Sequence, residues 1–282
     1  MSKRDFRIYW SEKIYKAYAS VFSRPQFSGF NRILFHLGLR GLGVLNYQNF
    51  NISGEYDFLL RFLKSCHSAI VIDIGANEGK YASTVKILNK AVEVYAFEPH
   101  PRIFKKLEES AARLQFHAFN YALHEQTGKS FLFDYLEQPE GSEHSSMNPS
   151  AFQEFYHKKS TRYEIITSML DHFIEEKKIK TLDLVKIDAE GQELAILRGA
   201  RQALRQNSIK VIQFEFNYLN VFNGEFMKSF HDLLPDFHFF RILSHGLLDL
   251  KDYDPLEWEI FAFQNIVAVH RQELANFTQK FK

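Results

Sequence analysis

Apolar residues along this chain follow two patterns, continuous runs and stripes at helical spacing. Runs at residues 69–74, 92–97, 182–187 and 211–216 predict strands that are buried on both faces, as in a parallel sheet. The segments between them, about 78–89, 102–112 and 192–206, repeat apolar residues at helical intervals. This alternation predicts an α/β fold with an open, mostly parallel sheet and helices on both faces.

The alternation is interrupted in the middle of the chain and near its C-terminus. Residues 129–135 and 163–167 predict two extra strands, with a polar loop at 138–148 between them. Residues 237–243 and 265–270 also read as strands, and no long helix separates them, so an antiparallel pair at the sheet edge is expected. We therefore predict a main domain over residues 51–271 and a polar tail, 272–282, that frays.

Residues 1–50 precede the sheet and predict an N-terminal helical extension. Apolar positions recur at helical spacing on both sides of a break at Arg24-Pro25. The extension is interpreted either as a cap over the sheet edge or substrate cleft, or as a peripheral membrane anchor, and we favour the cap. The anchor interpretation rests on the nearby basic residues Lys3, Arg4, Arg7, Lys13 and Lys16.

Composition and charge narrow the function classes. The 282 residues are 45% hydrophobic with 29 phenylalanines, which is enough for a sizeable core. A net charge of +1 gives no general attraction to nucleic acid, so no nucleic-acid partner is expected. Cys66 is the only cysteine, which excludes an internal disulfide and indicates a cytoplasmic location. We also expect no transmembrane segment and no signal peptide.

The stretch VIDIGANEG at residues 71–79 carries the clearest chemistry. Asp73 comes just before the end of a buried strand, and Gly75 and Gly79 flank a tight turn before a helix, where a ligand can meet bare backbone. Glu98 ends the next strand 19 positions after Gly79, close to the roughly 20 expected for a ribose-binding acid. Asn77 replaces the second glycine of G-x-G-x-x-G, which argues against a dinucleotide.

Polar side chains also follow several of the predicted parallel strands. Because the carboxyl ends of parallel strands meet at one edge of a sheet, these side chains are expected to line a ligand site. They are Asp73, Glu98, Asn120, Asp188, Glu215 and Asn217.

Six segments, in order, resemble the FkbM-type methyltransferases: VIDIGANEG, AFEPHP, NYALHEQTG, GSEHSS, SMLDHFIEE and DLVKIDAEGQELAILRGA. The resemblance covers residues 53–270. It implies an enzyme that depends on S-adenosylmethionine and a Rossmann-like class I methyltransferase fold. That fold has a mostly parallel seven-stranded sheet with an antiparallel closing strand.

The resemblance also implies which residues hold the cofactor. The Gly75–Gly79 turn approaches the methionine part, Glu98 accepts hydrogen bonds from the two ribose hydroxyls, and the stretch around Asn120 lies beside the adenine. The cofactor residues expected on this basis are Asp73, Gly75, Ala76, Asn77, Gly79, Glu98, Asn120 and Ala122.

For catalysis, the resemblance makes Asp188 the first candidate for the base that removes a hydroxyl proton, with Glu190 second. Lys186 shares a strand face with Asp188 and can hold its charge or orient the substrate; a purely structural ion pair is the alternative. His144 in the polar loop is another candidate base. Gly141, Ser142, Ser145 and Ser146 are expected to close the site or contact the acceptor.

Metal dependence is left open by the sequence. Asp188, Glu215 and Asn217 would form an oxygen set suited to Mg²⁺, although hydrogen bonding to a sugar explains them equally. The expected reaction is O-methylation of a hydroxyl on a sugar, glycan or specialised metabolite. A nicotinamide oxidoreductase and a non-catalytic binding protein are the alternatives, and the missing dinucleotide fingerprint disfavours the first.

Overall fold

The computed structural model describes residues 3–64, 66–137, 142, 145–148 and 158–282. The chain divides into two compact units, which meet between Leu42 and Gly43. The division comes earlier than the predicted boundary at residue 50, because Val44 pairs with Gln264 in the second unit. A capping role for the first unit stays a prediction.

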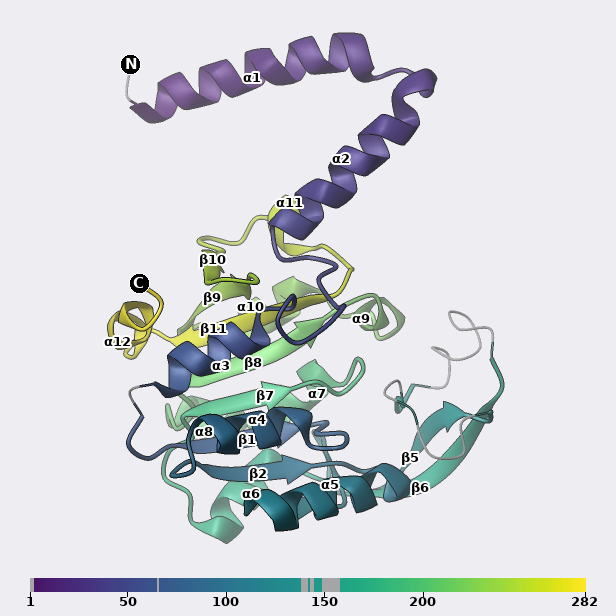
Figure 1. Cartoon of the computed structure of the whole chain (residues 1–282), viewed down its shortest axis with the longest axis vertical. Coiled ribbons are helices and arrows are strands. Elements are labelled where there is room, and N and C mark those ends of the chain that lie inside the picture. Colours follow the sequence, from purple (N-terminus) through teal and green to yellow (C-terminus); the bar gives the residue numbers. More distant parts are fainter. Residues whose placement is uncertain (1–2, 65, 138–141, 143–144, 149–157) are drawn as a thin grey trace. The chain divides into compact units, whose positions relative to one another are not determined.

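The N-terminal unit consists of α1 (Lys3–Phe22), a short 3-10 helix (Pro25–Phe27) and α2 (Ser28–Gly41), as Figure 1 shows. Pro25 follows the end of α1, as predicted from its missing N–H. The Phe22 ring packs on Phe27 and Phe30 with centroid distances of 5.1 and 5.6 Å. Asn31 Nδ2 donates to the Phe22 carbonyl at 3.0 Å, which joins the two helices. None of the described helices is long and apolar enough to cross a bilayer.

The main unit is built on an eight-stranded sheet in the order β10-β9-β11-β8-β7-β1-β2-β3. Its strands are β1 (Ile70–Ile74), β2 (Glu93–Phe97), β3 (His117–Phe119), β7 (Leu184–Ile187), β8 (Val211–Phe216), β9 (Phe237–Ile242), β10 (Leu247–Asp249) and β11 (Gln264–His270). The five strands from β3 to β8 are parallel, and β11 is antiparallel to β8 and β9. The predicted antiparallel pair is therefore confirmed. The sheet has eight strands instead of seven because β10 adds to the edge at β9.

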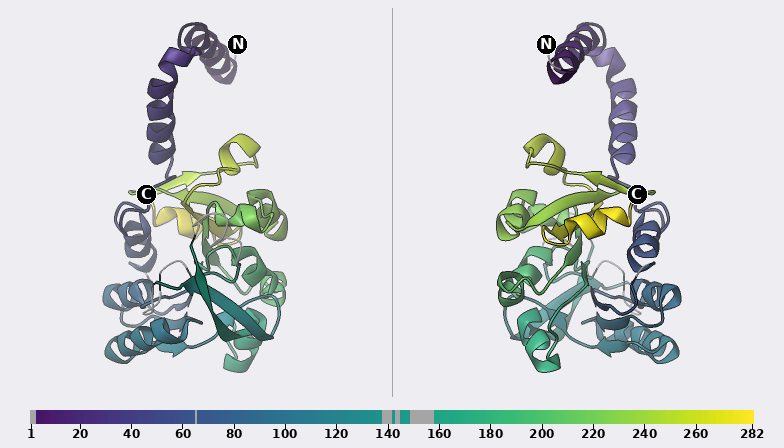
Figure 2. Two further views of the ribbon diagram at one scale, coloured as in Figure 1. Left: turned by 90° about the vertical axis from the view of Figure 1, so that its right-hand side faces the viewer. Right: turned by 90° about the vertical axis from the view of Figure 1, so that its left-hand side faces the viewer.

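Helices cover both faces of this sheet (Figure 2). One face packs against α3 (Glu55–Leu63), α4 (Lys80–Leu88), α5 (Pro101–Leu114) and α12 (Leu274–Gln279). The other packs against α6 (Leu170–Lys177), α7 (Glu193–Arg198), α8 (Arg201–Arg205), α10 (Met227–Leu233) and α11 (Pro255–Trp258). Short α9 (Leu219–Phe222) follows β8.

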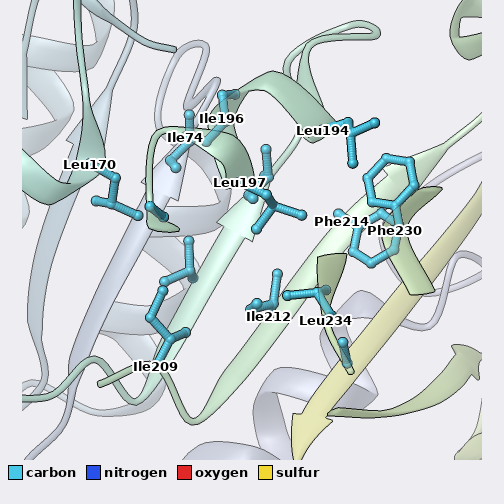
Figure 3. Close-up of a cluster of buried hydrophobic side chains, with 14 of the residues drawn as sticks. Ile74, Leu170, Leu194, Ile196, Leu197, Ile209, Ile212, Phe214, Phe230 and Leu234 are labelled. Atoms are coloured by element: carbon cyan, nitrogen blue, oxygen red, sulfur yellow. The ribbon is translucent and has the colours of Figure 1, made fainter. Parts of the chain in front are cut away.

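Strand residues alternate between the two cores, as the pleat requires. Val71 belongs to the core under α3 and α4, whereas Ile72 belongs to the other. Figure 3 shows that second core, where Leu194 and Leu197 of α7 and Phe230 of α10 lie over Ile212 and Phe214 of β8. The two hydrophobic cores hold the strands in place, and with them the strand ends that carry the polar residues.

A second, three-stranded sheet in the order β4-β6-β5 lies outside the main one. It consists of β4 (Ala122–Leu123), β5 (Gly128–Tyr135) and β6 (Ser160–Ser168), and β5 and β6 form the long ribbon in Figure 1. This sheet confirms the two extra strands predicted around the polar loop.

The predicted polar tail is corrected by the structure. Instead of fraying, residues 274–279 form α12, and Phe277 is only 3% exposed. Its ring lies 6.4 Å from that of Phe58 and 5.9 Å from that of Phe240. The prediction weighed the polar majority of this segment and missed that Phe277 and Phe281 can anchor it to the core.

Candidate active site

A cavity opens at the carboxyl ends of β1, β2 and β7. It brings together six of the predicted site residues: Gly75, Asn77, Glu98, Ala122, Asp188 and Glu190. Apolar side chains complete its wall, among them Phe97 and Leu132 from the two sheets and Ile196 from α7. Predicted cofactor and catalytic residues therefore face one space.

The glycine turn is built for close backbone contact. Gly75 has φ +72°, and a Cβ there would lie 1.8 Å from the Asp188 carbonyl oxygen. Its N–H donates to the Phe97 carbonyl at 3.0 Å, while the Asp188 N–H donates to the Ile74 carbonyl at 3.0 Å. The turn is thus tied to both neighbouring strands, and only glycine fits between them. Gly79, with φ +85°, precedes α4 and does not line the cavity.

Glu98 is held in one orientation by backbone donors. Asn77 N donates to its Oε2 at 3.0 Å, and His100 N donates to its Oε1 at 2.8 Å. Burial raises the pKa of Glu98 to about 7, against the two hydrogen bonds that lower it. Both oxygens keep lone pairs at the cavity wall, so the carboxylate can accept two hydroxyls.

Three other predicted cofactor residues lie outside the cavity wall and support it. Asn120 is exposed, and its Nδ2 donates to the carbonyls of Glu98 and Pro99 at 2.9 and 3.2 Å. Ala76 N donates to the Phe97 carbonyl at 2.9 Å. Asp73 is fully buried, and its Oδ2 accepts from the Ala82 N–H at 3.1 Å, which anchors the first turn of α4.

A row of polar side chains crosses the sheet beneath α3 and α4. Asp73, Lys186 and Gln213 are direct neighbours in register on β1, β7 and β8. The Tyr81 hydroxyl donates to Gln213 Oε1 at 2.7 Å, and Gln213 Nε2 donates to Glu55 Oε1 at 3.1 Å. No role had been predicted from the sequence for Glu55, Tyr81 and Gln213. Only Gln213 carried a signal, as the polar interruption of an apolar run.

Lys186 occupies the centre of this row. Its Nζ lies 3.1 Å from Asp188 Oδ2 and 3.6 Å from Asp73 Oδ1. Burial lowers the pKa of Lys186, but the carboxylates of Asp188, Asp73 and Glu55 outweigh it and hold that pKa above its ordinary value. Burial raises the pKa of Asp73, and Lys186 opposes that rise. Lys186 is therefore a cation. Its side chain does not line the cavity.

Asp188 and Glu190 stand on the cavity wall just after β7. The Asp188 side chain is 37% exposed, so it can meet a bound acceptor. The turn that carries both is shaped by Glu193, which the sequence analysis missed although it ends the same acidic motif. Glu193 Oε1 accepts from Ala189 N at 2.9 Å and Gly191 N at 3.2 Å. Burial raises the pKa of Glu193 to about 8.

The predicted magnesium set is not assembled. Asn217 Oδ1 accepts from the Leu219 N–H at 2.7 Å, and its Nδ2 donates to the Glu215 carboxylate, so the local turn occupies the amide. Burial, with the charges of Asp188 and Glu190, raises the pKa of Glu215 well above its ordinary value. Within the described part of the chain, no group of three or more His, Cys, Asp and Glu side chains could hold a metal ion.

Two described residues of the predicted loop, Ser145 and Met147, line the cavity. Ser146 Oγ donates to the Glu190 carbonyl at 2.9 Å. Ser142 N donates to Asp134 Oδ2 at 2.9 Å, and its hydroxyl also donates to that carboxylate. Gly141 and His144 lie outside the described residues, so the role predicted for His144 stays a prediction.

His100 connects this loop with the cofactor turn. Its Nδ1 accepts from Arg102 N and Ile103 N at 3.2 and 3.3 Å and so caps α5. Burial lowers the pKa of His100. Because Nδ1 accepts two hydrogen bonds, Nε2 is the ring nitrogen that can donate, and it lies 3.4 Å from Asp134 Oδ2. Since the backbone of His100 also holds Glu98, the Glu98 carboxylate and the loop share one buried support.

A comparison with protein-family models shows to which family the chain belongs. Residues 73–244 match the model described as the methyltransferase FkbM domain, which is more than half of the chain. The chain belongs to the FkbM methyltransferase family. This confirms the resemblance read from the six motifs, and the observed α/β architecture agrees with the fold expected for it.

Two curated relatives are similar over much of their length. The 2-O-methyltransferase NoeI of Sinorhizobium fredii is 22% identical over 187 residues, which cover 63% of this chain and 76% of NoeI. The hexuronic acid methyltransferase AglP of Haloferax volcanii is 26% identical over 169 residues, covering 58% of this chain and 63% of AglP. Among solved structures, an rRNA methylase from Streptococcus thermophilus aligns with a TM-score of 0.43 at 14% identity, covering 79% of this chain and 98% of that one.

The cavity fits the cofactor that this family implies. The bare backbone at Gly75 admits a ligand at the end of β1, and the fixed oxygens of Glu98 suit a ribose diol. S-adenosylmethionine has both a ribose diol and an amino-acid part that can lie along the turn.

Proposed function

We propose that this chain is an S-adenosylmethionine-dependent O-methyltransferase that acts on a hydroxyl of a sugar or glycan. The observation that carries the proposal is one cavity with Glu98 on one part of its wall and Asp188 on another. The name of one relative, a hexuronic acid methyltransferase, supports a sugar acceptor. The name of the other, a 2-O-methyltransferase, supports transfer to an oxygen.

In this proposal the turn and its surroundings position the donor. Gly75 and Asn77 lie along the methionine part, Glu98 accepts the ribose hydroxyls, and Ala122 lies beside the adenine. When bound, S-adenosylmethionine supplies a methyl group on a positively charged sulfur. The protein's task is then to align an acceptor oxygen with that methyl.

Asp188 is the proposed general base. It takes the proton of the acceptor hydroxyl as that oxygen gains the methyl group, and the proton then leaves to water. Lys186, 3.1 Å away, orients the Asp188 carboxylate, so its role is positioning. Glu190, on the same wall, is the second candidate for the base.

The competing functions differ in their ligands. The FkbM assignment, with Asn77 at the dinucleotide glycine position, argues against a nicotinamide oxidoreductase. A non-catalytic binding protein would hold S-adenosylhomocysteine but turn nothing over. The exclusion of a nucleic-acid acceptor and the cytoplasmic location stay predictions.

The test combines calorimetry with turnover. The protein is expected to bind S-adenosylhomocysteine and not NAD, and to methylate members of a panel of hexoses and hexuronic acids. Asp188→Asn is expected to lower kcat by about 100-fold or more, the usual contribution of a general base, while its S-adenosylhomocysteine affinity is kept. Preferential NAD binding would overturn the proposed function. Unchanged turnover in Asp188→Asn would shift the base to Glu190.

A further inference from the structure

The N-terminal unit carries an exposed apolar stripe on α2. Phe30, Ile33, Leu34 and Leu37 follow the i, i+3, i+4, i+7 spacing that places residues on one helix face. Between 41% and 61% of each of these four side chains is exposed. Large aliphatic and aromatic side chains in such an arrangement usually mark a surface that meets another apolar phase.

The described part of α1 repeats this pattern. Ile14, Tyr18 and Val21, at i, i+4 and i+7, are 63%, 38% and 48% exposed. Phe22 at the end of α1 packs on Phe30 of α2. The two helices therefore form one unit with an apolar stripe on each.

Basic residues accompany both stripes. On α2, the 100° step between residues places Arg40 about 70° from the centre of the apolar stripe, on its flank. Lys13 has a similar relation to the stripe of α1, about 100° from its centre. The first 42 residues contain eight of the 35 basic residues of the chain but only two of its 34 acidic ones. This unit thus has a net charge of +6, while the rest of the chain is net negative.

We propose that the N-terminal unit docks this surface on an anionic lipid bilayer, with both helices lying in the interface. An apolar stripe with cations on its flanks matches acyl chains beneath anionic headgroups. No described helix is apolar and long enough to span the bilayer, so the unit lies on it. The inference concerns a surface separate from the cavity and goes beyond the proposed function.

Charge distinguishes this partner from the other occupants of an apolar face. A second copy would bring another unit of net charge +6 against the first, and like charges repel. Nucleic acid would satisfy the cations but leave the stripe of Ile33 and Leu37 in water. An anionic bilayer satisfies both features at once.

The test is co-sedimentation of the full chain with vesicles. The protein is expected to sediment with phosphatidylcholine–phosphatidylglycerol vesicles and to a much smaller extent with phosphatidylcholine alone. Ile33→Asn with Leu37→Asn removes stripe area without adding charge and should abolish sedimentation. Lys13→Gln with Arg40→Gln should weaken binding about tenfold or more, since each cation near an anionic surface contributes about a fivefold factor.

Matched controls lie in the main unit. Ile87→Asn with Ile166→Asn changes two equally exposed isoleucines, and Lys105→Gln with Arg113→Gln removes two exposed cations. Both control variants should bind vesicles like the original protein. Circular dichroism and S-adenosylhomocysteine affinity should be unchanged in every variant, so failure of this inference is distinguishable from failure of the proposed function.

Three outcomes would overturn the inference. They are equal sedimentation with neutral and anionic vesicles, stripe variants that bind as well as the control variants, and a lipid-free dimer that the stripe variants abolish. The last outcome would assign the surface to a second copy of the chain.

Discussion

Glu98 combines a buried carboxyl with a proposed role, ribose binding, that its ionised form serves best. Because its pKa is raised to about 7, a part of the molecules carry it protonated at neutral pH. An ionised carboxylate can accept hydrogen bonds from both ribose hydroxyls, whereas the protonated form has lost one acceptor position. Proton release and ligand binding are therefore linked at this residue.

We predict that S-adenosylhomocysteine affinity rises as the pH increases from about 6 to about 8, through the raised pKa of Glu98. Calorimetry across this range measures it. Glu98→Gln should bind more weakly and lose the pH dependence, whereas Glu78→Gln, on the same turn but exposed, should keep it. An undiminished pH dependence in Glu98→Gln would assign the titration to another group.

Glu193 is a second buried carboxyl, and it supports a turn instead of facing the cavity. It accepts hydrogen bonds from two backbone N–H groups. Its pKa is about 8 when folded against an ordinary 4.5, so the folded protein binds the proton more tightly. Stability from this group is therefore complete below pH 4.5 and decreases as the pH rises toward 8.

Glu193→Gln keeps an acceptor oxygen and cannot ionise. We predict a free energy of unfolding close to that of the original protein at mildly acidic pH and a higher one at alkaline pH. Glu193→Ala leaves the Ala189 and Gly191 N–H groups without their acceptor and should cost about 2–3 kcal/mol. Denaturant unfolding at two pH values measures both. Equal stability of the alanine variant would show that water replaces the carboxyl.

At the scale of elements, the turn between β1 and α4 depends on a missing side chain. Gly75→Ala would force the ends of β1 and β7 apart, because the new Cβ meets the Asp188 carbonyl. We predict loss of S-adenosylhomocysteine binding together with a marked decrease in melting temperature. Gly246→Ala is the control, since Gly246 also has positive φ, +91°, but open space around it.

The Gly246→Ala variant should lose only about 1 kcal/mol of stability from backbone strain and keep its ligand affinity. If both alanine variants bound S-adenosylhomocysteine equally well, the close approach at Gly75 would not matter for the site.

The boundaries of some helices could not be predicted from the local pattern of apolar residues. The sequence predicts one helix over residues 192–206, but the structure has α7 and α8 with a break at Gly199 and Ala200. A Cβ on Gly199 would lie 2.2 Å from the His124 carbonyl, so the chain approaches β4 closely there. That contact joins segments 75 residues apart, so it cannot be predicted from the periodicity of apolar residues within one helix.

At the scale of the whole molecule, the division of the chain into two units after Leu42 predicts that the second unit folds and binds its ligand by itself. Both hydrophobic cores and every residue of the cavity belong to residues 43–282. A chain of residues 43–282 should therefore fold and bind S-adenosylhomocysteine with a Kd within about threefold of the full chain, a difference of about 0.6 kcal/mol. Calorimetry and thermal unfolding measure this. An insoluble fragment, or one with much weaker binding, would give the N-terminal unit a part in the cofactor site.

The sequence by itself determined the class of this protein, because the informative chemistry is local. The glycine turn, Glu98 and the Asp188 motif each lie at a strand end, and parallel strands bring their ends to one edge. The family match over residues 73–244 confirmed that assignment. Local order also identified six residues that the structure places on one cavity.

Only the tertiary structure decided which groups touch. Lys186 lies over the Tyr81 ring and within the electrostatic reach of Glu55 because the helices that carry these two residues pack over β7. His100 meets Asp134 because a second sheet folds against the turn. The docking of α12 likewise depends on Phe58 and Phe240, far away along the chain. Such contacts follow from strand register and from packing between distant segments. They set the pKa values and orientations of the site side chains, which cannot be predicted from the spacing of residues along the chain.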